Sequence, residues 1–259
     1  MKQKLNSLLW FLEAQLGLNP IRFVLFFFRF PQYIFDLLKF NLQKKHFKKI
    51  HLKPCLHDRS DVAGDVNHEY FWQDLLVAQK VFKLGNNKNI CDVGSRLDGF
   101  VAHLATAFPI TVMDIRPTNL QIPNVKFIVN DLMQSKIFNQ FDIVTCLHTI
   151  EHIGLGRYGD PIDHLGWEKA LESLTRMLKT NGKLILTTPV GSKKILFNAN
   201  YIFSTSELLH VSESLNLTLE NFSILKNEKF HTIELNKSNI KLINEKKYAL
   251  ALFEFTKRG

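Results

Sequence analysis

The chain has 259 residues, is 46% hydrophobic and carries a formal net charge of +9 at pH 7. This length suits one large domain, or one domain with an appendage, and the hydrophobic fraction is ordinary for a soluble protein that buries a core. The three cysteines, Cys55, Cys91 and Cys146, form no C-x-x-C pair and no zinc spacing, and so sparse a set is typical of a reducing cytoplasm. The first residues lack the apolar and small residues of a signal peptide, so none is expected.

The positive charge is concentrated at the N-terminal end of the chain. Residues 1–50 hold nine Lys or Arg residues and two acids, a net charge of +7, whereas the other 209 residues hold 24 bases and 22 acids, a net charge of +2. The pattern predicts two helices here, over residues 5–18 and 21–42, with Asn19-Pro20 as the break between them. We therefore predict a basic, Phe-rich helical arm over residues 1–60.

The arm shows no clear membrane span, because Arg22 and Arg29 interrupt its apolar run Ile21–Phe30 and a span needs about 20 apolar residues. Two functions remain open for it. Its aromatic and basic second helix could make a peripheral contact with the anionic inner face of a membrane. Its phenylalanines could instead pack on the rest of the chain or on a second copy, giving a homodimer. We expect a cytoplasmic protein, at the inner face of the membrane in the first case, and no nucleic-acid partner.

From about residue 65 the pattern changes to alternating strands and helices, which is typical of a parallel sheet. The predicted strands are 89–94, 110–114, 125–130, 141–147, 183–188, 220–225 and 248–256, and the predicted helices are 69–84, 97–108, 167–178 and 205–215. The polar segment 226–247 predicts a loop that contains one short strand near 230–235. We assign residues 61–259 to this α/β domain.

Polar residues follow five of the predicted strands at the point where each strand ends. They are Asp92-Val93-Gly94, Asp114, Asp131, His148 and Pro189. Ligands of open parallel sheets bind at the carboxyl ends of the strands. Five coincident strand ends therefore predict a ligand site at this edge more strongly than any single motif does.

The turn after the first strand discriminates between two kinds of cofactor. A dinucleotide turn reads G-x-G-x-x-G, and its middle glycine lets the backbone approach a pyrophosphate. Here the turn reads Gly94-Ser95-Arg96-Leu97-Asp98-Gly99, so a side chain at Arg96 blocks that approach, and Asp92 would repel a phosphate. S-adenosylmethionine has no phosphate. Asp92 could bind its ammonium directly or through water, and its carboxylate suits the helix N-terminus and Arg96.

Two further acids complete the predicted cofactor site. Asp114 lies 20 residues after Gly94, where an acid can accept hydrogen bonds from ribose hydroxyls. Asp131 could receive the adenine amine. Each acid could instead be a helix cap or a turn residue, but their order and spacing together favour the cofactor. The predicted cofactor-binding residues are Asp92, Gly94, Ser95, Arg96, Gly99, Asp114, Ile115, Asp131, Leu132 and Leu147.

These motifs resemble those of class I S-adenosylmethionine-dependent methyltransferases. The similar pieces are D-V-G-S-x-x-x-G, V-M-D-I-R-P, N-D-L, F-D-I-V-T-C-L-H-T-I-E-H-I and L-K-T-N-G-K-L-I-L-T-T-P, spread over residues 65–257. The resemblance implies a Rossmann-like, mostly parallel sheet of seven strands whose last strand is antiparallel. In this family the helix before the first strand, which here carries Tyr70, Trp72 and Asp74, often folds over the cofactor.

Three segments indicate a particular family within this class. Tyr70–Asp74, His148–Asp163 and Phe197–Asn200 look like a poorly characterised family of methyltransferase-like proteins, some of whose bacterial members are associated with surface polysaccharide synthesis. The resemblance implies that the acceptor belongs to cell-surface glycan synthesis.

The segment from Cys146 to Asp163 is too polar for a core and lies where the acceptor should bind. Methyl transfer is an in-line displacement that needs alignment, and a hydroxyl acceptor also benefits from a general base. We prefer His148 as this base, with an ordinary pKa near 6.5, and His152 is the alternative. Glu151 could orient a histidine, or could merely brace a short helix. The predicted residues for binding a small-molecule or glycan acceptor are Glu151, Arg157, Tyr158, Asp160, Asp163 and Asn198.

The function predicted from these residues is O-methylation of a sugar or other polar hydroxyl. A magnesium ion is conceivable at His148, His152, Asp160 and Asp163, but we predict no metal site. One rival is a nicotinamide-dependent sugar-nucleotide enzyme, against which Arg96 argues. The other is a Rossmann-like protein that binds cofactor or partners at a membrane without turnover.

Overall fold

The computed structural model describes residues 2–43, 50–60, 66, 68–84 and 88–259, and it divides into two compact units, Met1–Val66 and Asn67–Gly259. The first unit contains the predicted pair of helices, α1 (Lys2–Leu16) and α2 (Pro20–Gln43), and a short turn of helix, η1 (Asp58–Ser60). Asn19 caps α2 because its side-chain oxygen accepts the backbone N–H of Arg22 at 2.9 Å, and Pro20 occupies the first helical position, where no N–H is needed.

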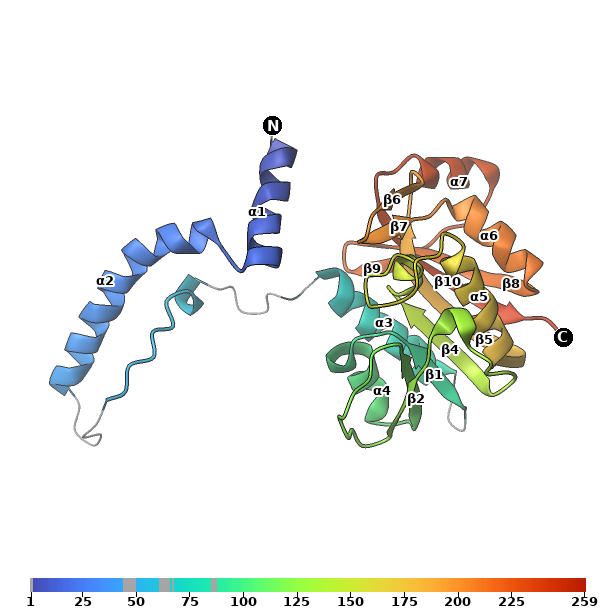
Figure 1. The fold of residues 1–259 in the computed structure, drawn as a ribbon, viewed down its shortest axis with the longest axis horizontal. Helices are drawn as coiled ribbons and strands as arrows, with labels where there is room; N and C mark the ends of the chain where they lie inside the picture. The colour runs from blue at the N-terminus through green and yellow to red at the C-terminus, as the bar shows by residue number, and fades with distance from the viewer. Residues whose placement is uncertain (1, 44–49, 61–65, 67, 85–87) are drawn as a thin grey trace. The chain divides into compact units, whose positions relative to one another are not determined.

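The second unit is built on one sheet (Figure 1). Its strands lie in the order β3-β2-β1-β4-β5-β10-β8-β9. Their bounds are β1 (Ile90–Val93), β2 (Ile110–Asp114), β3 (Val125–Val129), β4 (Phe141–Leu147), β5 (Leu178–Val190), β8 (Leu217–Lys226), β9 (Lys229–Thr232) and β10 (Ala249–Lys257). Strands β1 to β5 pair in parallel, and β10 runs antiparallel to both β5 and β8. The predicted Rossmann-like fold with an antiparallel last strand is confirmed.

The sheet has eight strands in place of the predicted seven. The additional strand is β9, which forms a hairpin with β8 from Ser223↔Thr232 to Lys226↔Lys229. It corresponds to the short strand expected near 230–235, and it extends the sheet at the edge farthest from β3.

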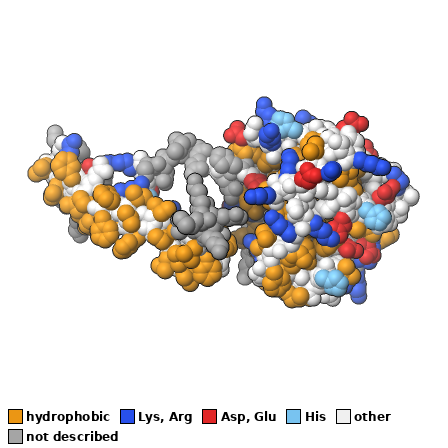
Figure 2. Space-filling model, turned by 90° about the horizontal axis from the view of Figure 1, so that it is seen from above, with side chains coloured by type: hydrophobic (Ala, Val, Ile, Leu, Met, Phe, Trp, Pro, Cys, Tyr) orange, Lys and Arg blue, Asp and Glu red, His pale blue; other side chains and the backbone are white. Residues whose placement is uncertain are grey.

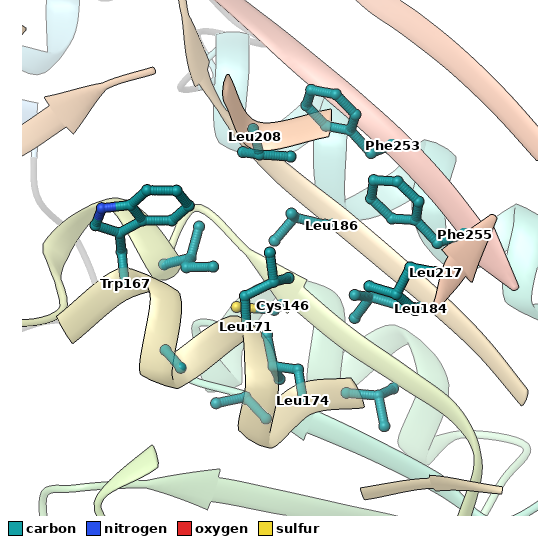
Figure 3. Packing of buried hydrophobic residues seen from close by; sticks show 14 of the residues in the cluster. Cys146, Trp167, Leu171, Leu174, Leu184, Leu186, Leu208, Leu217, Phe253 and Phe255 are labelled. Atoms are coloured by element: carbon teal, nitrogen blue, oxygen red, sulfur yellow. The ribbon is translucent and has the colours of Figure 1, made fainter. Parts of the chain in front are cut away.

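Helices cover both faces of the sheet. On one face, α3 (His68–Lys83) and the pair η2 (Leu97–Val101) and α4 (Ala102–Ala105) bury residues such as Val77, Phe100 and Leu104 against the strands. On the other face, α5 (Gly166–Met177), α6 (Thr205–Ser214) and α7 (Lys237–Asn244) cover the larger core. Figure 3 shows part of this second core, which contains Cys146, Trp167, Leu171, Leu174, Leu184, Leu186, Leu208, Leu217, Phe253 and Phe255.

Three segments differ from the predicted elements. The helix expected over 97–108 begins as a π-helical turn, η2, because Gly99 has non-helical dihedrals (φ −117°, ψ −109°). Strands β6 (Lys194–Leu196) and β7 (Asn200–Ile202) form an unpredicted hairpin. Helix α7 lies in the segment expected to be a loop, where Asn236 accepts the N–H of Asn239 as a cap. Two single turns, η3 (Leu132–Gln134) and η4 (Ile150–His152), follow β3 and β4.

Candidate functional site

A cavity of about 320 Å³ opens at the carboxyl ends of β1, β2, β3 and β4, which is the edge where the sequence predicts a ligand. Helix α3 and the segment after β4 complete its wall. The lining residues are Tyr70, Gln73, Asp74, Val93, Gly94, Ser95, Arg96, Met113, Asp114, Ile115, Arg116, Asn130, Asp131, Leu132, Leu147, His148, Thr149, His152, Ile153, Tyr158 and Asp160.

Asp92 does not line this cavity, contrary to the expectation that it contacts an ammonium group. It is fully buried, and its carboxylate accepts hydrogen bonds from the Ser95 N–H at 3.2 Å, the Ser95 hydroxyl at 2.7 Å and the Thr145 hydroxyl at 2.7 Å. Burial raises the pKa of Asp92 to about 6 although these hydrogen bonds oppose the shift. Asp92 therefore braces the turn from beneath and leaves direct ligand contact to other residues.

A different acid faces the cavity beside the turn. Asp74 of α3 lies against Gly99 so closely that a Cβ at Gly99 would stand 2.1 Å from Asp74 Oδ2. Asp74 accepts a hydrogen bond from the Gln73 amide at 3.1 Å, and burial raises its pKa. Gly99 itself does not line the cavity, so its contribution is to admit this carboxylate. The sequence placed Asp74 on the right helix but did not identify it as a binding residue.

The N-terminal side of the turn matches the prediction more closely. Gly94, Ser95 and Arg96 all line the cavity. Gly94 has a positive φ of 75°, and a Cβ there would meet the side chain of Thr149 at 2.4 Å. Arg96 extends toward solvent, where it pairs with Asp98 at 2.8 Å. The turn thus exposes the backbone of Gly94 to the cavity and carries the guanidinium of Arg96 at the cavity rim.

The acids that follow β2 and β3 both line the cavity, and both already have partners. Asp114 is held by Arg116, which donates from Nε at 2.9 Å, from Nη2 at 2.7 Å and from its backbone N–H at 2.8 Å. Although burial would raise the pKa of Asp114, Arg116 lowers it. Asp131 caps η3 by accepting the N–H of Met133 at 2.9 Å. The predicted Ile115, Leu132 and Leu147 form apolar parts of the wall.

His148 is held between two carboxylates. Its Nδ1 is hydrogen-bonded to Glu151, its Nε2 lies 3.3 Å from Glu69 Oε1, and only 7% of its side chain is exposed. Burial alone would lower its pKa, but the charge and hydrogen bond of Glu151, together with Glu69, raise the pKa to about 9. His148 is therefore an imidazolium at neutral pH, and the expectation of a free base with a pKa near 6.5 is wrong.

His152 has the opposite character. Its Nδ1 lies 2.7 Å from the carbonyl oxygen of Ala199, which can only accept, and 3.2 Å from Nη1 of Arg157, which can only donate. Because Arg157 also donates to this oxygen at 2.9 Å and the carbonyl contact of Nδ1 is the shorter, we place the proton on Nδ1. Burial lowers the pKa of His152, and the neighbouring Arg157 adds to this effect. His152 is thus a neutral imidazole that lines the cavity, and a proton on Nδ1 leaves Nε2 as the basic nitrogen.

Glu151 joins these two histidines. It is fully buried, outside the cavity lining, and its Oε1 lies 3.9 Å from His152 Nε2 while it pairs with His148. Its second oxygen accepts from the Thr188 hydroxyl at 3.2 Å. Glu151 is therefore a positioning residue, and the predicted direct contact with an acceptor is not supported by this geometry.

The remaining predicted acceptor residues separate into two groups. Tyr158 and Asp160 line the cavity, and the Tyr158 ring lies beneath the guanidinium of Arg116 at 4.5 Å and that of Arg157 at 5.2 Å. Asp160 also organises its own loop, because it accepts the N–H groups of Gly154 at 2.7 Å and Gly156 at 3.1 Å.

The second group lies outside the cavity lining and consists of Arg157, Asp163 and Asn198. Asp163 accepts a hydrogen bond from Lys169 at 2.5 Å, which explains why it does not face the cavity. Across the described ranges of the chain, no cluster of three or more His, Cys, Asp or Glu side chains is arranged to hold a metal ion.

Several cavity residues were not predicted from sequence. Gln73, Met113, Arg116, Asn130 and Thr149 are among them. Arg116 could have been predicted, because it follows the predicted cofactor residue Asp114 by two positions in the motif V-M-D-I-R-P. Gln73 and Thr149 reach the cavity only through the packing of α3 and the turn after β4, which sequence spacing does not show.

Solved structures share this fold at low sequence identity. The N-methyltransferase NodS from Bradyrhizobium japonicum WM9, in complex with S-adenosylhomocysteine, is 13% identical with a TM-score of 0.53, covering 76% of this chain and 90% of that one. Phosphoethanolamine N-methyltransferase 2 from Haemonchus contortus, in complex with S-adenosylmethionine, is 17% identical with a TM-score of 0.51, covering 72% and 52%. The similarity shows that the chain has the class I methyltransferase fold.

A third structure shows that this fold does not dictate the reaction. The [4+2]-cyclase SpnF is 14% identical with a TM-score of 0.53, covering 75% of this chain and 86% of that one. The reaction must therefore be argued from the site itself.

Sequence comparison places the chain in a family. No curated protein sequence matches it. Residues 118–254, from the loop after β2 to the last strand, match the family model described as "Caenorhabditis protein of unknown function, DUF268". Because this match spans more than half of the chain, the protein belongs to the DUF268 family.

Proposed function

We propose that the protein is an S-adenosylmethionine-dependent methyltransferase that methylates a hydroxyl group of a polar acceptor. The observation that carries the proposal is the cavity itself. It joins the glycine turn, the acids after β2 and β3, and a neutral histidine, in one space at the carboxyl end of the sheet.

The cavity residues fit the cofactor group by group. Asp74 is a buried carboxylate with a raised pKa beside the turn, and an ammonium ion would stabilise its charged form. Asp114 can accept hydrogen bonds from the two ribose hydroxyls, which would replace the hydrogen bonds that the Arg116 side chain donates to it here. Ile115 and Leu132 supply apolar walls for a flat base. S-Adenosylmethionine supplies an activated methyl group on a cationic sulfur.

His152 supports a general base in this site. It is neutral at pH 7, and its Nδ1 proton is committed to the Ala199 carbonyl, so Nε2 can accept the proton of an acceptor hydroxyl as its oxygen attacks the methyl carbon. His148 remains an imidazolium between Glu151 and Glu69, and the Ala199 carbonyl holds the ring of His152. Tyr158 and Asp160 provide the polar and aromatic contacts for the acceptor.

The finer assignment is a sugar hydroxyl in cell-surface glycan synthesis. Its support is the resemblance of His148–Asp163 and Phe197–Asn200 to the methyltransferase-like family linked to surface polysaccharides. The contact of Ala199 with His152 and Arg157 places the second of these segments beside the base.

One rival function has an observation in its favour. The three hydrogen bonds from Arg116 fill the oxygen atoms of Asp114 that a ribose would need, as expected of the form of the rival in which a Rossmann-like protein binds partners and not the cofactor, without turnover. Calorimetric titration separates the two. We expect S-adenosylmethionine and S-adenosylhomocysteine to bind and NAD not to bind. Failure of both adenosyl compounds to bind would overturn the proposed function and leave the binding protein as the better account.

Turnover is tested by the release of S-adenosylhomocysteine from S-adenosylmethionine in the presence of mono- and oligosaccharides. The wild-type protein should release it with at least one hydroxyl acceptor. A protein that binds S-adenosylmethionine but responds only to amine acceptors would contradict the assignment of a hydroxyl.

A further inference from the structure

Helix α2 presents an apolar face to solvent. We define the apolar face as Phe23, Phe27, Phe30, Ile34, Phe35 and Leu38. No residue of α2 is buried, and Phe23, Phe27 and Phe35 are 67%, 60% and 65% exposed. Hydrophobic side chains cover much of this part of the chain in Figure 2. So large an exposed apolar surface marks an interaction site.

The charged residues of α2 lie on the opposite side of the helix. At about 100° per residue, Arg22, Arg29, Asp36 and Lys39 fall within roughly 100° of arc, and the apolar face is centred on the other side. Within the first unit, the chain's own contacts use the charged side, because Arg59 pairs with Asp36 at 2.7 Å and Arg29 with His57. Among the described residues of the first unit, the return segment around Arg59 therefore contacts the polar side of α2 and not its apolar face.

The width of the apolar surface argues against a partner helix. Viewed down the axis of α2, its exposed apolar residues occupy an arc of roughly 200°. Phe26 lies at one border of this arc and Phe28 at the other. A helix partner covers only a narrow stripe, whereas the interface of a bilayer can bury half of a helix along its whole length.

The charge balance indicates which kind of surface this is. Residues 1–50 carry nine Lys or Arg residues and two acids, a surplus that anionic lipids attract. No single helix among the described residues is long and apolar enough to cross a bilayer. Residues Leu8–Leu16 and Pro20–Gln43 meet that criterion only when combined, and they are bent by 77°.

We propose that the N-terminal arm binds the surface of an anionic lipid bilayer, with α2 lying in the plane of the interface on its apolar face. This inference is independent of the proposed methyl transfer. It assigns the apolar face to lipid, in place of the packing on the rest of the chain or on a second copy that the sequence also allowed.

The test is co-sedimentation of the full chain with two kinds of vesicle, phosphatidylcholine alone and phosphatidylcholine with 30% phosphatidylserine. We expect binding that is stronger on the anionic vesicles, weakens with salt, and is reversed by alkaline carbonate as for a surface-bound protein. Retention after carbonate would show a spanning segment and overturn the proposal.

Two substitutions of equal charge locate the contact. Phe27→Glu places a negative charge on the apolar face, and Gln32→Glu places the same charge on the polar side. Gln32→Glu should weaken binding by about fivefold at most, through charge alone. Phe27→Glu should weaken it at least tenfold more, because the phenylalanine can no longer be buried.

Equal losses for the two variants would contradict the proposed orientation. A protein that ignores both vesicles and changes from dimer to monomer on Phe27→Glu would show instead that a second copy covers this face. Thermal unfolding of both variants should match that of the wild-type protein, since α2 contributes no buried residue.

Discussion

His148 and His152 lie four residues apart in a single turn, and their surroundings shift their pKa values in opposite directions. Two carboxylates hold His148 in its charged form, whereas burial and Arg157 favour the neutral form of His152. When their surroundings push the pKa values of two neighbouring groups apart, one group can act as a base while the other stays protonated. Under the proposed function, His152 is the base, and His148 is the cation that pairs with the buried Glu151.

Replacing His152 by alanine should lower kcat by roughly 10²- to 10⁴-fold, because the reaction loses its base, while the affinity for S-adenosylhomocysteine stays unchanged. In the wild-type protein, the acid limb of the kcat profile should lie below pH 6.5, since burial lowers the pKa of His152 from that value. Rates measured between pH 5 and 9 check this. Full turnover by His152→Ala would remove it as the base.

The raised pKa of His148 predicts a pH dependence of stability. A histidine whose pKa rises from 6.5 in the unfolded chain to about 9 in the fold stabilises the fold fully below pH 6.5 and loses that contribution as the pH rises through 9. The free energy of unfolding should fall by on the order of 2 kcal/mol between pH 6.5 and 9.5. Urea unfolding at several pH values measures this free energy in the wild-type protein and in His148→Gln. If it falls equally with pH in both proteins, His148 is not the cause of the pH dependence.

Under the proposed function, Asp74 takes the place of Asp92 as the partner of the ammonium group, because Asp74 lines the cavity and Asp92 does not. Asp74→Asn should weaken S-adenosylhomocysteine by roughly 10- to 100-fold through loss of a charge-assisted hydrogen bond. It should leave 5′-methylthioadenosine unaffected, since that compound lacks the ammonium. Asp98→Asn, which removes an exposed carboxylate at the same turn, is the control. If Asp74→Asn lowers the affinity for both ligands equally, Asp74 does not bind the ammonium group.

At the scale of elements, the start of the helix after β1 depends on a contact between two segments. The turn η2 and helix α3 approach so closely at Gly99 that only a hydrogen fits beneath the Asp74 carboxylate. The conformation of η2 and the aim of Asp74 are therefore coupled, although 25 positions separate the two residues in the sequence.

Gly99→Ala should consequently reproduce the ligand selectivity of Asp74→Asn. The new methyl group displaces the carboxylate, so the affinity for S-adenosylhomocysteine should fall and that for 5′-methylthioadenosine should not. A double-mutant cycle with Asp74→Ala checks the mechanism. In that background Gly99→Ala should have little further effect, and additive losses would contradict the steric explanation.

The elements that sequence predicted best are those with strong local patterns. Strands β2 and β4 have the predicted bounds, because each is a mostly apolar run with a polar residue at its end, Asp114 in β2, or directly after it, His148 after β4. The hairpin of β6 and β7 and helix α7 were missed because they are short; β7 buries two of its three residues, and Ile243 is the buried residue of α7. Their stability comes from tertiary packing, which local propensity does not encode.

At the scale of the whole molecule, sequence predicted where the site lies better than how it works. The carboxyl edge of the sheet follows from the alternation of strands and helices, and most predicted cofactor residues line the cavity there. The pairing of Glu69 with His148 spans 79 positions, and the burial of Asp92 depends on Thr145 of β4. Charge states set by such distant neighbours cannot be inferred from spacing along the chain.

The group formed by Glu69, His148 and Glu151 has an electrostatic consequence. Both glutamates have lowered pKa values and His148 a raised one, so at neutral pH the three side chains carry one net negative charge behind the cavity, with His148 as the member that lines it. Such a field attracts a cationic sulfonium and not a neutral thioether. Under the proposed function, methyl transfer would remove the positive charge from the sulfur of the ligand, so this attraction would weaken in the same step that makes the product.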